Sequence, residues 1–169
     1  EVVSGEDEER PLVADAAGVV EQHPRRHRLA EIRHVRKVGA DVGVQVRPDG
    51  ALAVVEGITF AFGGGFGFTY AYREIPLRDG ERIANVAVLE GGKPYRPGAP
   101  TELEPGGPPG TFGVEDLGGR VRIVWRYQAT DEVRRFTIRY RLTGLPVAYD
   151  DVVDVNLQVW GDEWGEPLG

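Results

Sequence analysis

Glu56 is the residue whose position points most directly to chemistry, because it interrupts an apolar pattern. It shares the alternation of Leu52, Val54 and Ile58, so the two-residue period of a strand directs its carboxylate toward the core. A buried carboxylate is costly unless it is paired, and otherwise it stays neutral through a raised pKa. Arg73 interrupts the next predicted strand in the same way. We therefore predict a buried Glu56–Arg73 pair that fixes the register of two consecutive antiparallel strands.

A catalytic role for Glu56 is the alternative hypothesis. Glu56 and Glu74 would then form a carboxylate pair in a carbohydrate-binding or glycosidase-like domain, with their carboxyls about 5–9 Å apart. The alternation does not direct these two side chains to one point, and no other catalytic group is placed beside Glu56. We therefore expect a non-enzymatic domain with no cofactor.

Arginines alternate with apolar residues along two consecutive predicted strands, near residues 120–127 and 135–142. If these strands are neighbours, their arginines form one basic face that binds an acidic polymer, anionic lipid headgroups or an acidic protein. The alternative is a solvated face that the chain's own Asp and Glu residues neutralise. The candidate binding residues are Arg122, Arg126, Arg135, Arg139 and Arg141.

An acidic cluster near the end of the chain is the one candidate for a metal site. Asp150, Asp151 and Asp154 supply the oxygen ligands that Ca²⁺ prefers. The spacing and internal glycine of an EF-hand are absent, and Asp151 and Asp154 fall on opposite faces of a strand. Turn capping or pairing with the arginines is the expected role, so we expect no metal here and keep Ca²⁺ as the alternative.

The composition excludes several classes of protein and several kinds of chemistry. The chain has 169 residues, of which 41% are hydrophobic and 28% are charged, as in a globular domain. The formal net charge of −7 gives no electrostatic basis for binding nucleic acid. The absence of cysteine excludes disulfides, thiolate catalysis and Cys-ligated metals.

The elements that must position the candidate residues are short strands. Apolar alternation predicts about eight strands between residues 40 and 160, and Asp49-Gly50 is typical of a hairpin turn. Gly63-Gly64-Gly65 is interpreted as a second hairpin turn. The glycines and prolines of residues 91–113 predict one long irregular loop. The pattern favours an antiparallel β-sandwich, with a closed barrel as the competing fold.

Three regions follow from this pattern. Residues 1–38 are predicted to be an N-terminal extension that is poorly ordered or partly helical, because Leu29, Ile32 and Val35 recur every third residue. Residues 39–164 form the predicted sandwich and residues 165–169 a tail. The chain begins with Glu and lacks Met, so we expect it to be a piece of a larger protein.

Several blocks of the sequence, in order, resemble the YciQ-like family of predicted bacterial membrane proteins, a domain-of-unknown-function family. The similar blocks cover residues 40–164, and only the aromatic Gly63–Gly67 turn departs from the expected pattern. The blocks are Asp49–Phe60, Tyr72-Arg73-Glu74-Ile75-Pro76, Trp125-Arg126-Tyr127, Phe136–Tyr140, Tyr149–Val152 and Trp160–Trp164.

The resemblance implies a β domain on the extracytoplasmic side of the cell membrane, attached through segments that this chain does not contain. It establishes no catalytic residue. We therefore expect a non-enzymatic binding or sensing domain whose ligand is unknown.

Overall fold

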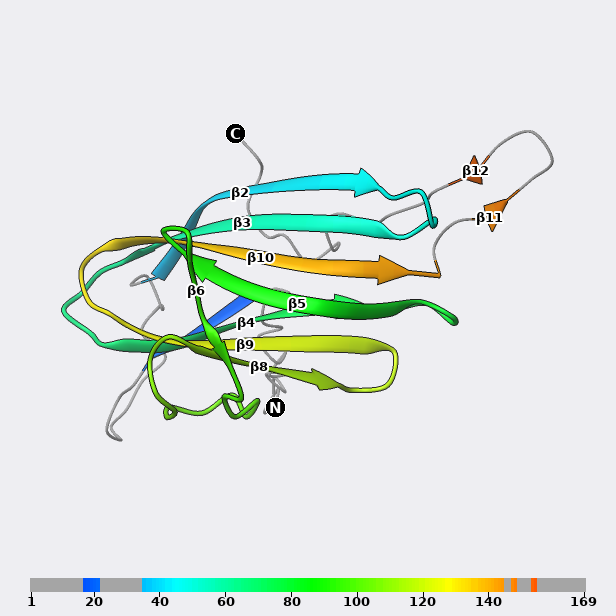
Figure 1. The fold of residues 1–169 in the computed structure, drawn as a ribbon. Helices are drawn as coiled ribbons and strands as arrows, with labels where there is room; N and C mark the ends of the chain where they lie inside the picture. Colours follow the sequence, from blue (N-terminus) through cyan, green and yellow to red (C-terminus); the bar gives the residue numbers. More distant parts are fainter. Residues whose placement is uncertain (1–16, 22–34, 145–146, 149–152, 155–169) are drawn as a thin grey trace, which may run out of the picture.

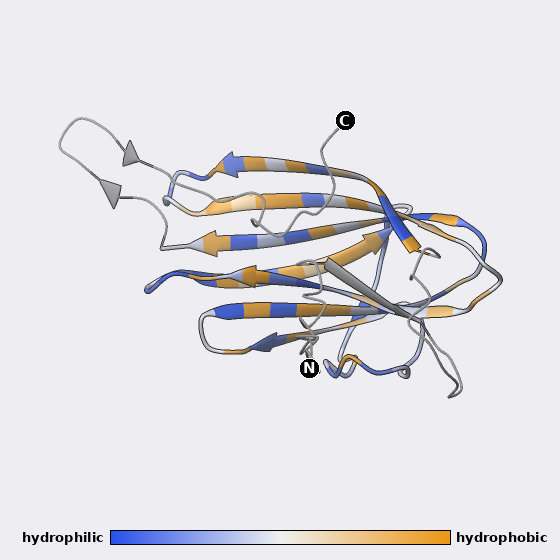
Figure 2. Ribbon diagram, turned by 180° about the vertical axis from the view of Figure 1, so that it is seen from behind, coloured by the Kyte–Doolittle hydropathy of each residue, from blue (hydrophilic) through white to orange (hydrophobic). Residues whose placement is uncertain are grey.

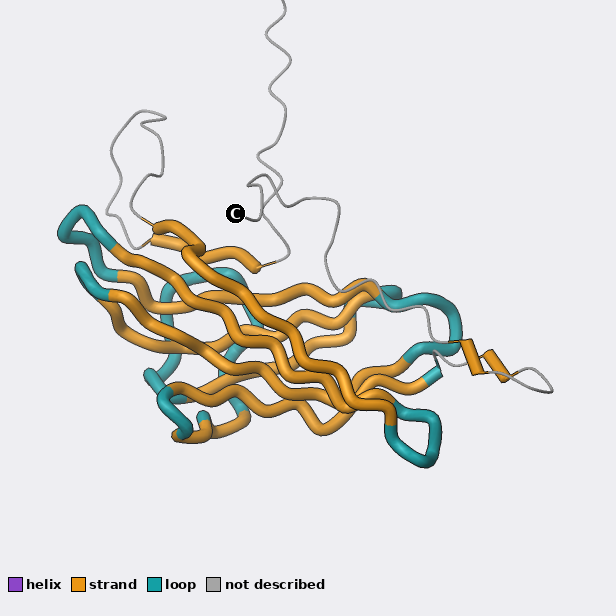
Figure 3. Tube along the Cα trace, turned by 90° about the horizontal axis from the view of Figure 1, so that it is seen from above, coloured by secondary structure: helices purple, strands orange, loops and turns teal. Residues whose placement is uncertain are grey.

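The computed structural model describes residues 17–21, 35–144, 147–148 and 153–154. Every regular element within these ranges is a strand, and strands and loops alone are drawn in Figure 3. The strands form two five-stranded sheets and one separate two-stranded pair. This arrangement confirms the predicted all-β sandwich. Within the described ranges, no helix has the length and apolar character that crossing a membrane requires.

The first sheet runs in the order β1-β4-β9-β8-β7. All its neighbours are antiparallel except β7 and β8, which are parallel. Its strands are β1 (Ala17–Glu21), β4 (Phe68–Pro76), β7 (Arg96–Pro97), β8 (Thr111–Asp116) and β9 (Arg120–Ala129).

The second sheet runs in the order β2-β3-β10-β5-β6, with every pair antiparallel. Figure 1 shows β2, β3, β10 and β5 side by side, with β9 and β8 below them. Its strands are β2 (Val35–Val46), β3 (Leu52–Phe62), β5 (Arg82–Glu90), β6 (Lys93–Pro94) and β10 (Val133–Thr143). The separate pair consists of β11 (Val147–Ala148) and β12 (Val153–Asp154).

The core lies between the two sheets and is rich in aromatic rings. Strand alternation sends one set of side chains inward from each sheet, and the alternating colours of Figure 2 follow this period. Phe136 and Trp125 are fully buried, and their ring centroids are 5.6 Å apart. Tyr127 lies 4.9 Å from the Phe136 ring. Burying each such ring contributes about 1.5–3 kcal/mol, so these contacts hold the two sheets together.

Of the two turns predicted as hairpins, one joins neighbouring strands and the other crosses between the sheets. The Asp49-Gly50 turn joins neighbours β2 and β3 as predicted, and the Ala51 amide donates to the Asp49 carboxylate at 3.2 Å. The Gly63–Gly67 segment instead leads from β3 in the second sheet to β4 in the first, so the hairpin interpretation was wrong. The alternation of a strand is the same whether the next strand pairs with it or faces it.

A second crossover leads from β9 to β10 and lies against the first. Its Asp131 carboxylate accepts a 2.9 Å hydrogen bond from the Gly65 amide, and the Phe62 amide donates to the Glu132 carbonyl at 2.8 Å. Asp131 has a φ of 49°, a conformation that Asp tolerates better than most residues. The two crossovers therefore close one end of the sandwich together.

The segment from β6 to β7 closes one side of the sandwich. β6 pairs with β5 of the second sheet, and β7 pairs with β8 of the first (Figure 1). Between them, the Tyr95 amide donates to the Val88 carbonyl at 2.8 Å, and the Tyr95 ring packs on the core. The prediction of an irregular loop over residues 91–113 was therefore wrong at β6, at β7 and at the start of β8.

Two further differences concern the ends of the chain. β1 and the first residues of β2 lie within the predicted N-terminal extension, and β1 pairs with β4. Val35 is in a strand, so the predicted helix does not reach it; Leu29 and Ile32 lie outside the described residues. The run predicted as one strand from Val147 contains the two short paired strands β11 and β12. The domain boundaries at residues 38 and 164 stay predictions.

A substitution at Gly113 tests how closely the loop after β7 packs on β8. A Cβ at this position would lie 2.2 Å from the Ala99 carbonyl oxygen and 2.9 Å from Thr101 Cγ2. We expect Gly113→Ala to cost about 1–3 kcal/mol, because backbone must move to admit the methyl group. Thermal melting measures the loss, at roughly 2–4 °C per kcal/mol for a chain of this size.

Gly43→Ala is the matched control, because a Cβ there meets nothing within 4 Å on edge strand β2. Its melting temperature should equal or slightly exceed that of the parent, since alanine restricts the unfolded chain. Equal losses for both variants would contradict the packing described above.

Candidate functional site

Glu56 and Arg73 meet in the core as an ion pair between the two sheets. Arg73 Nε donates to Glu56 Oε2 at 2.8 Å, and a second guanidinium nitrogen donates to Oε1 at 3.4 Å. Glu56 is 4% exposed and Arg73 6% exposed. The remaining contacts of the pair are also to protein, since the Tyr140 hydroxyl donates to Glu56 Oε1 at 2.7 Å and Arg73 donates to the Glu74 carbonyl. The carboxylate therefore accepts three hydrogen bonds and is fully partnered.

Tyr140 extends this network to β10. Burial, reinforced by the Glu56 charge and hydrogen bond, raises the pKa of Tyr140 well above its ordinary value of 10.0. The phenol therefore stays protonated and donates to the carboxylate throughout the neutral range. Sequence reasoning missed Tyr140 as a third member, although its inward position in the alternation was a usable signal.

The route by which the pair forms differs from the prediction. β3 and β4 belong to different sheets, so Glu56 and Arg73 face each other across the core instead of lying on neighbouring strands. The alternation of each strand directs Glu56 and Arg73 into the core whether the two strands are neighbours or lie in opposite sheets. The sequence therefore predicted the partner but not the geometry of the pair. The pair connects one sheet to the other.

Glu74 lies on the opposite face of its sheet from Arg73, because successive side chains of a strand alternate. Its carboxylate contacts Arg122 at 2.7 Å and Arg120 at 3.4 Å on the outer surface. Glu56 is enclosed in the core and Glu74 is outside it. The two carboxylates therefore share no cleft, and this arrangement gives no support to glycosidic chemistry.

The structure does not bring the five predicted arginines onto one face. β9 carries Arg122 and Arg126 in the first sheet, whereas β10 carries Arg135, Arg139 and Arg141 in the second. The prediction of a single basic face from these strands was therefore wrong. The cause is again a crossover that resembles a hairpin in the sequence.

Arg126 is an anchor for the loop that covers the first sheet. It is 1% exposed, and it donates to the carbonyls of Pro100 at 2.8 Å and Glu102 at 2.7 Å and to that of Glu104. Its guanidinium lies 4.9 Å from the centroid of the Tyr70 ring, and burial lowers its pKa. It is thus unavailable to an external ligand.

Tyr70 supports the same loop from the outer face of β4. Its hydroxyl donates to the Leu103 carbonyl, and its ring packs with Tyr72 and Val124. Burial raises the pKa of Tyr70 to about 12. The loop over residues 98–110 therefore covers much of this face of the first sheet.

The outer face of the second sheet is basic, with members that the sequence reasoning did not name. Register puts Arg36 of β2 and Arg82 of β5 on the same face as Arg135, Arg139 and Arg141, because Arg36 pairs with Ala61 and Arg82 with Thr143. Two aspartates partly neutralise this surface. Asp49 pairs with Arg141 at 2.6 Å, and Asp41 pairs with Arg135. We call these five arginines the basic face.

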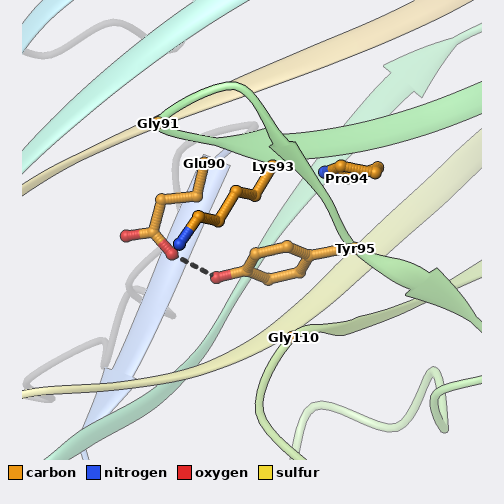
Figure 4. A pocket seen from close by; sticks show the side chains of 6 residues that line it. All are labelled: Glu90, Gly91, Lys93, Pro94, Tyr95 and Gly110. Atoms are coloured by element: carbon orange, nitrogen blue, oxygen red, sulfur yellow. Dashed lines mark hydrogen bonds between the residues drawn. The ribbon is translucent and has the colours of Figure 1, made fainter.

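A pocket of about 520 Å³ opens where β5, β6 and the following loop meet (Figure 4). Glu90 is its central polar group. The Tyr95 hydroxyl donates to Glu90 Oε2 at 2.6 Å, and Arg134 donates to both carboxylate oxygens, to Oε2 at 2.6 Å. Figure 4 shows the Lys93 side chain lying alongside Glu90. The lining residues are Glu90, Gly91, Lys93, Pro94, Tyr95 and Gly110.

The Glu90 carboxylate and the Tyr95 hydroxyl of this pocket are already partnered by the protein. Burial opposes ionisation of Glu90, but hydrogen bonds from Arg134 and Tyr95 outweigh it and lower the pKa of the carboxyl. Burial and the Glu90 bond raise the pKa of Tyr95. Sequence reasoning missed this cluster because Lys93 and Tyr95 fall in the segment predicted as an irregular loop. The cluster fixes Tyr95, in the segment between β6 and β7, to β5 and β10 of the second sheet.

Metal ligation finds no support in the described part of the chain. Among those residues no group of three or more His, Asp or Glu side chains is placed to hold an ion. Asp150 and Asp151 lie outside the described residues, and for Asp154 only its place in β12 is described. The Ca²⁺ alternative therefore stays a prediction.

The fold and the sites define a two-sheet β domain with an internal ion pair and one basic outer face. Residues 39–169 match the family model described as "Predicted membrane protein (DUF2207) N-terminal domain". The chain therefore belongs to this family, in agreement with the resemblance of its sequence blocks. No curated protein and no solved structure matches the chain.

Removing Glu56 tests the energetic role of the inter-sheet pair. We expect Glu56→Ala to cost about 3–5 kcal/mol, because it leaves Arg73 charged and buried without its partner. At roughly 2–4 °C per kcal/mol, thermal melting should show a fall on the order of 10 °C. Replacing Glu56 and Arg73 together with leucine should recover much of the loss.

Glu115→Ala is the control, since its 3.8 Å contact with Arg122 is at the surface and should contribute at most about 1 kcal/mol. A Glu56→Ala variant that melts within a degree or two of the parent would show that the pair does not stabilise the fold.

The lowered pKa of Glu90 predicts that the contribution of this residue to folding stability is lost in acid. Because its folded pKa is lowered from 4.5, the contribution is present above about pH 4.5 and is lost as the pH falls through the lowered value. The stability difference between the parent and Glu90→Gln, measured by chemical denaturation, should therefore shrink between pH 7 and about pH 3. Tyr95→Phe, which removes one donor and keeps Arg134, should show a smaller change. An unchanged difference for Glu90→Gln would contradict the assignment.

Proposed function

We infer that this chain is a non-enzymatic binding domain that a membrane protein holds on the extracytoplasmic side of the membrane. The family description supports the attachment to a membrane protein. The observation that carries the binding role is the contrast between the two outer faces. The first sheet is covered by a loop that the buried Arg126 anchors, whereas the second sheet keeps exposed arginines.

The buried polar groups support a non-enzymatic role. Glu56 is enclosed and accepts three hydrogen bonds from Arg73 and Tyr140. Glu90 is held by Arg134 and Tyr95, with its pKa lowered, which is the opposite of what a general acid needs. Each of these carboxylates stabilises the sandwich, and neither is free to receive a substrate.

The side of the membrane is tested on the full-length protein in cells. Asp79 is exposed in the loop after β4, and the 169-residue sequence contains no cysteine. We expect Asp79→Cys to react with a membrane-impermeant maleimide while the cytoplasmic membrane is intact, because the domain lies outside it. The parent protein, labelled in parallel, is the control for cysteines elsewhere. Reaction only after lysis would place the domain inside and overturn the proposal.

A further inference from the structure

We propose that the basic face of the second sheet docks onto an anionic phospholipid surface. The inference rests on the proposed function in one respect, since it requires that the domain lie beside a membrane. It adds the surface that makes the contact and the chemistry of its partner. The residues of this surface are Arg36, Arg82, Arg135, Arg139 and Arg141.

Charge complementarity is the first argument. Five arginines and two aspartates, Asp41 and Asp49, give the face a formal surplus of three positive charges. Arg139 forms no ion pair with any described residue and is exposed. At the surface of an anionic bilayer, each such side chain strengthens binding about fivefold. Three uncompensated charges are therefore enough for measurable, reversible attachment.

The whole-chain charge of −7 does not contradict this surface, because the acidic excess lies elsewhere in the sequence. Residues 35–144 contain 15 Lys and Arg against 13 Asp and Glu, a surplus of two positive charges. The remaining residues contain 5 against 14, which is the whole acidic excess. At physiological ionic strength charges act over only about 8 Å, so the local surplus decides the contact.

The shape of the face is the second argument. The outward side chains of the central strand β3 are Ala53, Val55, Gly57, Thr59 and Ala61. All of these side chains are short, and the longer arginine side chains of β10 lie beside them. At Gly57 a Cβ would lie 2.5 Å from an Arg135 nitrogen and 2.6 Å from Asp41 Oδ1, so this ion pair lies over the β3 backbone. A face with only short side chains along its central strand suits a plane of headgroups.

Exposed valines complete the surface. Val133 is 66% exposed and pairs with Ala61, and Val55 is 38% exposed and pairs with Arg139, so register places both on this face. Apolar side chains beside arginines are the combination that the interface of a bilayer accommodates, with the apolar groups at the acyl boundary and the charges at the headgroups. An acidic protein would need only the arginines for binding, and the exposed valines would add nothing to that contact.

The test is co-sedimentation of the whole 169-residue chain with vesicles. Vesicles of phosphatidylcholine with phosphatidylglycerol should bind the chain at low ionic strength and release it at high salt, whereas vesicles of phosphatidylcholine alone should not. Arg139→Gln removes one charge and should weaken binding about fivefold, and Arg139→Glu changes the charge by two and should weaken it roughly 25-fold.

Arg120→Glu is the matched control, because it makes the same change in charge on the outer face of the first sheet. It should bind nearly as the parent does, and circular dichroism should show that both variants are folded. Equal weakening by Arg120→Glu and Arg139→Glu would mean that net charge alone matters, and it would overturn the assignment of the face.

A soluble polyglutamate peptide separates the lipid surface from an acidic polypeptide. If the chain binds this peptide in an Arg139-dependent manner but does not bind anionic vesicles, the partner is a protein and the proposal fails. Failure on vesicles, together with maleimide labelling from outside the cell, would leave the proposed function intact. Labelling only after lysis would overturn that function whatever the vesicles show.

Discussion

The fold depends on one buried interaction, the ion pair between Glu56 and Arg73. Two sheets that meet through apolar rings alone have many near-equivalent ways to slide, whereas a carboxylate and a guanidinium in the core have one arrangement that satisfies both. Three hydrogen bonds to Glu56, from Arg73 and from Tyr140, connect β4 of the first sheet with β3 and β10 of the second. We regard this network as the feature that sets the alignment of the sheets.

The difference between the two outer faces follows from one loop. Both sheets carry arginines outward, yet Arg126 is enclosed by the carbonyls of Pro100, Glu102 and Glu104. A buried guanidinium needs such acceptors, so the loop and the arginine stabilise each other. The second sheet has small outward residues on β3 and long cations around them. One face is thus covered by its own loop, whereas the other keeps its arginines exposed.

Particular residues show how far sequence reasoning reaches. The alternation of Val121, Ile123 and Trp125 predicted a strand with a buried face, and β9 has it. The same reasoning joined β9 to β10 by a hairpin, although they lie in different sheets. The strands of the breaker-rich segment were also missed, because β6 and β7 are two residues long and arise from pairing with β5 and β8.

The sequence by itself determined the all-β class, the inward position of Glu56 and Arg73, and the family, because each depends on residue order and local period. Only the tertiary structure decided which strands share a sheet. The physical reason is that a strand's alternation records which side chains are buried, and it is the same whether the next strand pairs beside it or packs opposite it. That choice separated Arg126 from Arg139, brought Arg36 and Arg82 to the basic face, and placed Glu74 outside the core that holds Glu56.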